Sequence, residues 1–189
     1  MENKKVNLRF GIICVAILLA AASRLIPHPA GFAPIVGMAL FGAAYYSKRY
    51  WAYIIPIAAM IVSDVVLNMF VHSAYTNGHP FSIMSLYTSG ALVLIVLTGT
   101  FMLKKVRVPN VAVSAVGASV IFHLVTNFGT WISWSMYPHT WEGLGACYVA
   151  GLPFFRNGLA GDLIYTGVLF GAFELLMYTF PSLKPQKTA

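Results

Sequence analysis

The chain has 189 residues, of which 59% are hydrophobic and only 9% are charged. Soluble domains carry about 25% charged residues, so this composition excludes an ordinary soluble domain. The formal net charge of +7 would suit a nucleic-acid binder, but the positions of the basic residues, described below, indicate a different role.

Apolar runs recur along almost the whole chain and predict an all-α membrane protein with six transmembrane helices. A hydrocarbon core about 30 Å thick needs about 20 apolar residues per helical span. The predicted spans cover residues 10–26, 33–46, 51–71, 85–103, 110–134 and 158–180. No stretch between them is long or polar enough for a soluble domain, so we expect residues 1–189 to form a single integral membrane domain.

Two segments differ from a simple series of full-length spans. The second predicted span is short and has Pro34 in its first turn, where a missing backbone N–H leaves no helical bond unmade. Before the sixth span, Leu144–Phe155 is apolar but only 12 residues long, about 18 Å as a helix. That is too short to cross a bilayer. We therefore expect a short interfacial or re-entrant helix, kinked near Pro153, over the outer mouth of the bundle.

Ten of the 12 basic residues fall on one side of this six-span arrangement. They precede the first span or follow the second, fourth and sixth: Lys4, Lys5, Arg9, Lys48, Arg49, Lys104, Lys105, Arg107, Lys184 and Lys187. Only Arg24 and Arg156 lie toward the other side. Because cytoplasmic loops are enriched in Lys and Arg, this bias predicts that both termini are cytoplasmic. The basic excess is thus explained by topology, and we expect no nucleic-acid partner.

A stripe of polar and aromatic residues runs along the fifth predicted span. His123, Asn127, Trp131 and Trp134 are spaced by four, four and three residues and therefore share one helix face. A polar stripe in hydrocarbon is costly unless it faces a cavity or another helix. We therefore predict that these residues bind a substrate. Two alternatives stay open: the tryptophans could form an interfacial belt, and His123 could be a neutral hydrogen-bonding residue between helices.

Further polar residues gather in the outer halves of other predicted spans. They are Arg24 and His28 after the first span, Asp64 and Asn68 in the third, and Asn157, Asp162 and Tyr165 at the start of the sixth. Together with the stripe they predict a substrate-binding cavity that opens outward, with the first and third outer loops as lids. The alternative for each acid is structural. A charge inside a membrane costs about 2.5–3.5 kcal/mol, so either acid could simply pair with Arg24 or Arg156.

The sequence predicts no metal, no cofactor and no catalytic centre. Four of the five histidines and Cys147 lie toward the outer side, yet none of them has the tight spacing of a metal site. No serine or cysteine stands in a recognisable nucleophile motif. An intramembrane enzyme that uses Asp64, Asp162 or His123 is the outlying alternative.

Two alanines four residues apart, Ala16 and Ala20, lie on one face of the first predicted span. Small residues at this spacing let helix backbones approach closely in lipid. They serve either packing within the bundle or the docking of another membrane subunit.

Several segments together resemble an uncharacterised bacterial family of six-helix transport proteins. They are Arg24-Leu25-Ile26-Pro27-His28-Pro29, Phe32-Ala33-Pro34-Ile35, Ala39-Leu40-Phe41-Gly42-Ala43, Ser63-Asp64, Thr126-Asn127-Phe128-Gly129-x-Trp131, Tyr137-Pro138-x-Thr140, Cys147-Tyr148, Pro153-Phe154-Phe155-x-Asn157 and Gly161-Asp162-Leu163. The resemblance extends over nearly the whole chain. That family is in turn, more distantly, similar to the substrate-binding S-components of energy-coupling factor (ECF) transporters.

The resemblance implies a multi-pass protein of the bacterial cytoplasmic membrane, with both termini inside and a ligand site open to the outside. It implies a vitamin or related micronutrient as the small-molecule substrate. It further implies two kinds of partner: a transmembrane coupling subunit that docks on Ala16 and Ala20, and a pair of cytoplasmic ATPases. The chain has no Gly-x-x-x-x-Gly-Lys-Ser/Thr phosphate loop of its own, so a partner would have to supply the energy.

We therefore expect a membrane-embedded substrate-binding subunit, of the ECF S-component type, for the uptake of a vitamin-like small molecule. The first alternative is a stand-alone carrier, coupled to protons through Asp64 or Asp162. The further alternative is the intramembrane enzyme.

Overall fold

All regular structure in the described part of the chain is helical, as predicted. The computed structural model of the protein describes residues 2–71 and 79–184, with side chains from Leu8 onward. The elements are α1 (Glu2–Ser23), α2 (Ile35–Tyr45), α3 (Arg49–Val66), the π-helical segment η1 (Leu67–Val71), α5 (Ile83–Met102), α6 (Val108–Ser133), α7 (Trp141–Thr179) and a 3-10 turn, η2 (Pro181–Leu183).

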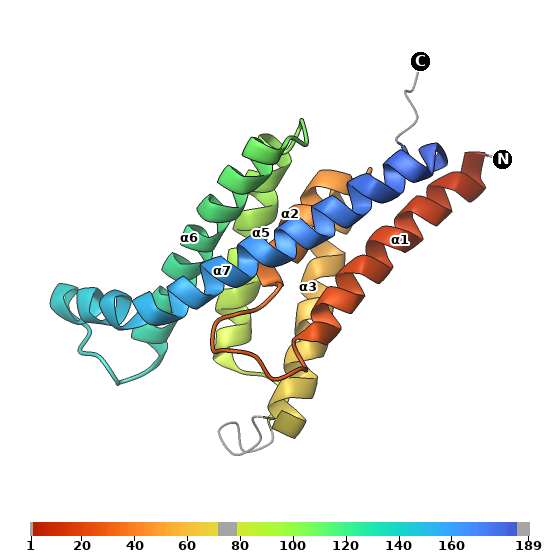
Figure 1. The fold of residues 1–189 in the computed structure, drawn as a ribbon. Helices are drawn as coiled ribbons and strands as arrows, with labels where there is room; N and C mark the ends of the chain where they lie inside the picture. Colours follow the sequence, from red (N-terminus) through yellow and green to blue (C-terminus); the bar gives the residue numbers. More distant parts are fainter. Residues whose placement is uncertain (1, 72–78, 185–189) are drawn as a thin grey trace.

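The helix ends divide the molecule into two opposite ends (Figure 1). The start of α1, the end of α7, and the turns α2–α3 and α5–α6 lie together at one end, the termini end. The first loop (24–34) and the α6–α7 turn (134–140) lie at the other, the loop end. Arg9 holds the termini end together, because its guanidinium donates hydrogen bonds to the carbonyl oxygens of Tyr45 (3.2 Å) and Leu183 (3.0 Å).

Four helices are long and apolar enough to cross a membrane: α3 together with η1, α5, α6 and α7. Leu8–Ser23 of α1 and the whole of α2 are apolar but shorter. By length and composition the described chain therefore has four candidate spans, and not the six transmembrane helices that the sequence predicts. With 11 residues, α2 extends only about 17 Å, roughly half of a hydrocarbon core.

The short helix α2 lies at the centre of the bundle. It packs against α1, α3, α5, α6 and α7, and nine of its 11 residues are buried. Phe41 makes edge-to-face contacts with Phe170 and Phe173 of α7, at ring-centroid distances of 5.7 and 5.4 Å. Because its neighbours enclose it, α2 needs neither the length nor the lipid-facing surface of an outer helix.

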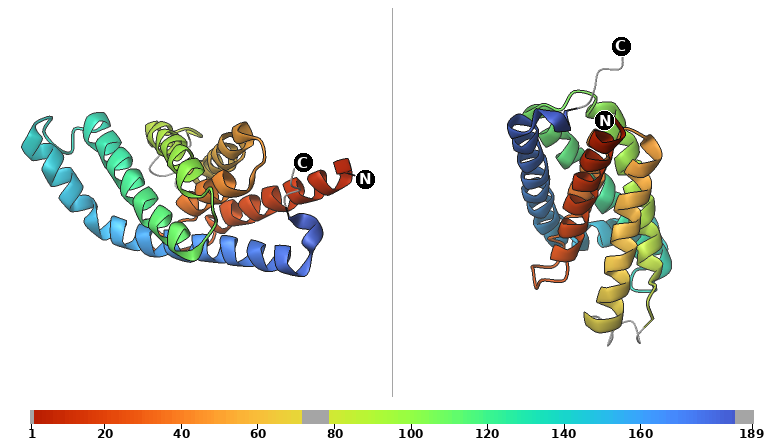
Figure 2. Two further views of the ribbon diagram at one scale, coloured as in Figure 1. Left: turned by 90° about the horizontal axis from the view of Figure 1, so that it is seen from above. Right: turned by 90° about the vertical axis from the view of Figure 1, so that its right-hand side faces the viewer.

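α7 is one continuous helix of 39 residues, and this corrects the prediction of a separate short helix before the last span. Thr140 is its N-cap and accepts a hydrogen bond from the backbone N–H of Gly143 (3.2 Å). Pro153 lies inside the helix without ending it, and the helix curves along the length of the molecule (Figure 2). A proline removes one backbone hydrogen bond and commonly bends a helix. At about 58 Å, α7 is nearly twice as long as a hydrocarbon core is thick.

Two glycines on α6 allow a matched test of the α5–α6 contact. A Cβ at Gly129 would overlap the ring of Tyr87 on α5, whereas a Cβ at Gly117 would meet no atom within 4 Å. We expect Gly129→Ala to lower the free energy of unfolding by about 1–3 kcal/mol through overpacking. Gly117→Ala should leave it unchanged or raise it by up to about 1 kcal/mol, because alanine favours helices. Thermal unfolding in detergent measures both, and equal melting temperatures would contradict this packing.

Candidate functional site

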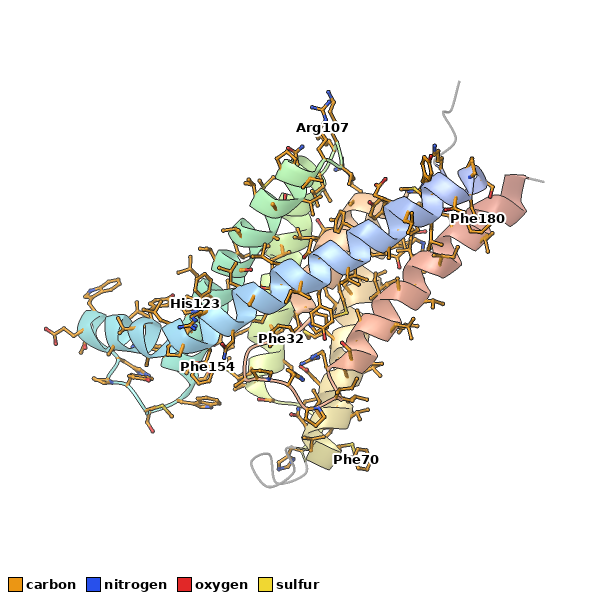
Figure 3. The ribbon with its side chains drawn as sticks, in the orientation of Figure 1. Phe32, Phe70, Arg107, His123, Phe154 and Phe180 are labelled. Atoms are coloured by element: carbon orange, nitrogen blue, oxygen red, sulfur yellow. The ribbon has the colours of Figure 1, made fainter. Side chains whose placement is uncertain are left out.

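A cavity of about 660 Å³ lies at the loop end, between the first loop, α2, the end of α3, α6 and α7. This volume is within the range of roughly 300–1,000 Å³ that is typical of small-molecule sites. Most of the wall is apolar; its polar side chains are Arg24, His28, Ser119, His123, Thr126, Asn127 and Asp162. In Figure 3, His123 and Phe154 lie close together at this end, and Arg107 and Phe180 lie far away at the termini end.

The cavity adjoins the buried N-terminus of α2, where the chain runs as the irregular first loop instead of as a helix. Ala33 of the loop and Ile35 and Val36 of α2 line the wall. Irregular backbone that protein buries has to find hydrogen-bond partners within the molecule. Because α2 starts late, the irregular first loop forms part of the cavity wall.

The first loop is held against α7 by backbone contacts. Gly31 has φ = 86°, a left-handed conformation that favours glycine. A Cβ at this position would lie 2.6 Å from the carbonyl oxygen of Phe154, so the two backbones approach too closely for any side chain. Close by, the Asn157 amide donates a hydrogen bond to the carbonyl oxygen of Ala30 (3.1 Å). Asn157, a predicted ligand residue, thus positions the loop.

Arg24 and Asp64 form an ion pair at the edge of the cavity. The Nη2 atom of Arg24 lies 2.6 Å from Oδ1 of Asp64, and the two side chains are 11% and 16% exposed. Arg24 also donates a hydrogen bond to the hydroxyl of Ser63, and the hydroxyl of Ser85 donates to Oδ2 of Asp64 (3.0 Å). The pair joins the first loop to α3 and α5. The structural alternative for Asp64, pairing with Arg24, is therefore present in the structure.

Asp162 has no such partner among the described residues. Its side chain lines the cavity, the residue is only 5% exposed, and the Ser119 hydroxyl donates a hydrogen bond to Oδ2 (2.6 Å). The Arg24–Asp64 pair is the one ion pair within 4 Å found in the described part of the chain. Asp162 is thus a buried acid at the cavity wall that is hydrogen-bonded but not paired with a cation.

His123 and Asn127 form a hydrogen-bonded pair on α6. The Asn127 amide nitrogen donates to the His123 carbonyl oxygen (2.9 Å) and lies 3.0 Å from its Nδ1 atom. An amide nitrogen only donates, so Nδ1 accepts and the imidazole proton resides on Nε2. The rings of Phe155 and Tyr148 flank the imidazole at 4.9 and 5.9 Å. On α7, a Cβ at Gly151 would overlap Oδ1 of Asn127, so this glycine lets the two helices meet.

The structure brings together five of the 11 predicted substrate-binding residues. Arg24, His28, His123, Asn127 and Asp162 line the cavity. The other six do not line it: Asp64, Asn68, Trp131, Trp134, Asn157 and Tyr165. Ligand contact by these six stays a prediction.

Trp131 and Tyr165, like Asp64 and Asn157 above, have other contacts that account for their positions. The indole N–H of Trp131 donates a hydrogen bond to the carbonyl oxygen of Pro138 (3.0 Å), which holds the turn between α6 and α7. The hydroxyl of Tyr165 accepts a hydrogen bond from Ser23 (2.9 Å), which links α7 to the end of α1. Trp134 follows α6 as its C-cap residue.

The sequence missed two polar wall residues, Ser119 and Thr126, and three aromatic ones, Phe122, Phe154 and Phe155. Ser119 precedes His123 by four residues, so extending the polar stripe by one helical turn would have included it. The phenylalanines carry no comparable signal, because an aromatic residue in an apolar helix is as compatible with lipid or core contact as with a cavity.

The described residues contain no group of three or more His, Cys, Asp or Glu side chains that could hold a metal ion. Cys147 is buried, and its Sγ lies 3.4 Å from the carbonyl oxygen of Asn127. The Nδ1 atom of His28 lies 2.6 Å from the carbonyl oxygen of Ile26. These side chains therefore do not converge on a common point.

A second, smaller hollow runs between α1 and α7. This apolar groove of about 250 Å³ is lined by Ala16 and Ala20, the two predicted docking residues, together with apolar side chains of α7 such as Leu169 and Leu176. The two alanines therefore face a groove in this chain. Docking of a partner subunit on them stays a prediction.

The described residues form an all-helical bundle, with four helices long and apolar enough for membrane insertion and a small-molecule-sized cavity at the loop end. The chain belongs to a family of unknown function, DUF6580, which it matches over residues 4–183. Comparison with curated proteins gave no match, and neither did comparison with solved structures.

The Arg24–Asp64 pair predicts an asymmetric effect of removing its members. Arg24→Met leaves the carboxylate of Asp64 buried without a counter-charge, and loss of one member of a fully buried pair typically costs about 3–5 kcal/mol. We expect a clearly lower melting temperature, near the low end of that range since both groups keep some exposure. The double variant Arg24→Met with Asp64→Asn should recover part of the loss. Thermal unfolding in detergent measures this, and a double variant less stable than Arg24→Met would contradict the pairing.

Proposed function

We propose that the protein is a membrane-embedded substrate-binding subunit, of the ECF S-component type, for the uptake of a vitamin-like small molecule. The observation that carries this proposal is the cavity of about 660 Å³. Its wall is mostly apolar and includes five of the polar residues that the sequence predicts to bind a substrate. Apolar walls with a few well-placed polar groups are typical of sites that bind small organic molecules.

In the proposed topology all six α-helices lie in the bacterial cytoplasmic membrane and the termini end faces the cytoplasm. The turns at that end carry Lys48, Arg49, Lys104, Lys105 and Arg107. At the loop end, Arg24 is neutralised by Asp64. This asymmetry supports the orientation, because cytoplasmic turns are enriched in basic residues. The cavity would then open on the outer side, where an incoming solute arrives.

His123 and Asn127 are suited to hold a polar group of the ligand. Because the Asn127 amide nitrogen is engaged by His123, the imidazole offers its Nε2–H as a donor and Asn127 offers Oδ1 as an acceptor. The rings of Phe122, Phe154 and Phe155 provide apolar contact on the same wall. The ligand would be held by a few directional hydrogen bonds within a largely apolar enclosure.

The proposed partners are a transmembrane coupling subunit and a pair of cytoplasmic ATPases. The sequence contains no phosphate-binding loop, which supports an external source of energy. The apolar groove between α1 and α7, with Ala16 and Ala20 in its wall, is the surface we assign to the coupling subunit.

Native mass spectrometry of the gently purified protein tests the proposed function directly. We expect a co-purified small molecule in the mass range of vitamins, released on activation and identified by liquid chromatography with mass spectrometry. A protein that is folded but reproducibly empty, and that binds no member of a vitamin panel, would contradict the proposal.

Variants of the α6 pair test the assigned site. His123→Ala and Asn127→Ala should each weaken binding of the co-purified ligand about tenfold, because a hydrogen bond worth about 1–1.5 kcal/mol is lost from the site. Asn110→Ala, which changes a half-buried residue at the other end of α6 whose amide donates a hydrogen bond to the carbonyl oxygen of Lys105, is the control and should bind normally. Isothermal titration calorimetry measures the affinities. Unchanged affinity in both cavity variants, with normal melting temperatures, would reject this site.

A second candidate function, a proton-coupled carrier, is favoured by Asp162. This acid lines the cavity without an ion-pair partner among the described residues, whereas Asp64 is paired with Arg24. Buried acids facing a membrane cavity commonly relay protons in carriers. Uptake into liposomes that contain only this chain, abolished by collapse of the proton gradient and by Asp162→Asn, would favour the carrier over the binding subunit.

A further inference from the structure

The charge of the cavity wall carries information about the ligand. Four titratable or charged side chains line the cavity: Arg24, His28, His123 and Asp162. The positive charge of Arg24 is matched by the carboxylate of Asp64, 2.6 Å away. The Nδ1 atom of His123 accepts a hydrogen bond from Asn127, as a neutral imidazole does. Among the described residues, Asp162 is therefore the wall charge without a counter-charge.

The local contacts of Asp162 do not supply a full compensating charge. Ser119 and the backbone N–H of Val36 contribute two neutral hydrogen bonds, whereas a carboxylate has about four acceptor positions. The N-terminus of α2 adjoins the same cavity through Ile35 and Val36, and the positive end of a helix dipole corresponds to about half an elementary charge. A buried carboxylate is normally paired with a cation. No cationic group of the described residues lies within 4 Å of Asp162, so a bound cation would complete it.

The aromatic residues of the wall add a second feature that points the same way. Phe122 from α6 and Phe154 and Phe155 from α7 line the same cavity as Asp162. The faces of aromatic rings carry partial negative charge and attract ammonium and other organic cations. A carboxylate together with aromatic rings in an otherwise apolar cavity is a favourable environment for a cation that carries apolar substituents.

We infer that the ligand of this cavity is a small organic cation, with its positively charged nitrogen against Asp162 and its apolar part among the phenylalanines. The inference rests on the proposed function, since it names the chemical class of the solute that the subunit binds. The donor and acceptor of His123 and Asn127 would hold a polar substituent of the same molecule.

The test uses two pairs of probes that differ only in charge: choline with its uncharged isostere dimethylbutanol, and the pyridinium ion of methylated nicotinamide with its uncharged isostere meta-toluamide. Isothermal titration calorimetry on the full chain in detergent gives the affinities. We expect at least one cation to bind about tenfold or more tightly than its uncharged isostere. Equal affinities within both pairs, or no binding of either cation, would overturn the inference.

A variant that removes the charge of Asp162 tests whether this residue causes the preference for cations. Asp162→Asn keeps the shape of the side chain and should reduce the preference for the cation to about twofold or less. Glu142→Gln, which removes an exposed acid near the start of the same helix, is the matched control and should keep the wild-type preference. A preference retained in folded Asp162→Asn would also overturn the inference. If this variant does not fold, the affinity ratio of the wild-type protein still decides.

The two proposals can fail separately. A neutral or anionic molecule that co-purifies with the protein, and whose binding depends on His123 and Asn127, would support uptake of a solute and overturn the cationic class. Absence of any ligand, together with no binding of the four probes, would overturn both.

Discussion

The arrangement of the bundle depends on one constraint, the burial of α2. This helix starts inside the molecule, after a loop in which Pro27, Pro29 and Pro34 disfavour a helix, so that loop must satisfy its backbone by other means. It does so by lying against α7, where Gly31 brings the loop onto the backbone of Phe154 and the amide of Asn157 caps the carbonyl of Ala30. The irregular loop in turn leaves the volume that becomes the cavity, so one short helix determines both the centre of the fold and the position of its site.

Two acids of similar appearance in the sequence have opposite environments in the structure. Asp64 is neutralised by Arg24 and hydrogen-bonded by Ser85, which makes it a junction between the first loop, α3 and α5. Asp162 has two neutral hydrogen-bond donors, the Ser119 hydroxyl and the backbone N–H of Val36, and a place on the cavity wall. Burial of a charged group without a partner is costly, so an unpaired buried acid is a candidate for binding a ligand or ion. The difference between the two carboxylates therefore separates the structural ion from the candidate functional one.

The sequence was informative where a physical rule acts locally. Hydropathy located α2, α3 with η1, α5 and α6 to within two residues of each end, but it began the first span eight residues after the start of α1 and the last span 17 residues after the start of α7. It also counted α2 as a span, because an apolar run does not reveal whether lipid or protein surrounds it. The spacing of His123 and Asn127 correctly placed both on one wall, because helix periodicity is a local property. Trp131 has the same spacing, but its indole is engaged by the carbonyl of Pro138 in a turn whose path depends on tertiary packing. The continuity of α7 through Pro153 was missed for a similar reason: proline weakens a helix, and flanking contacts decide whether it ends.

The continuous helix α7 connects the cavity with the termini end of the molecule. From Phe154 to Thr179 the helix contains no proline, and along this length it lines the cavity, crosses α2 and reaches the termini end. α2 and α7 cross in close contact, since a Cβ at Gly37 would lie 3.1 Å from the backbone nitrogen of Thr166. α7 therefore cannot move closer to α2 at this point. Beyond it, Glu174 accepts a hydrogen bond from Tyr45 (2.6 Å), next to the carbonyl group that binds Arg9. Because α7 is continuous between the two ends, a displacement at one end is transmitted along the helix to the other. Any tilt of α7 therefore couples the shape of the cavity to the contacts of the opposite face.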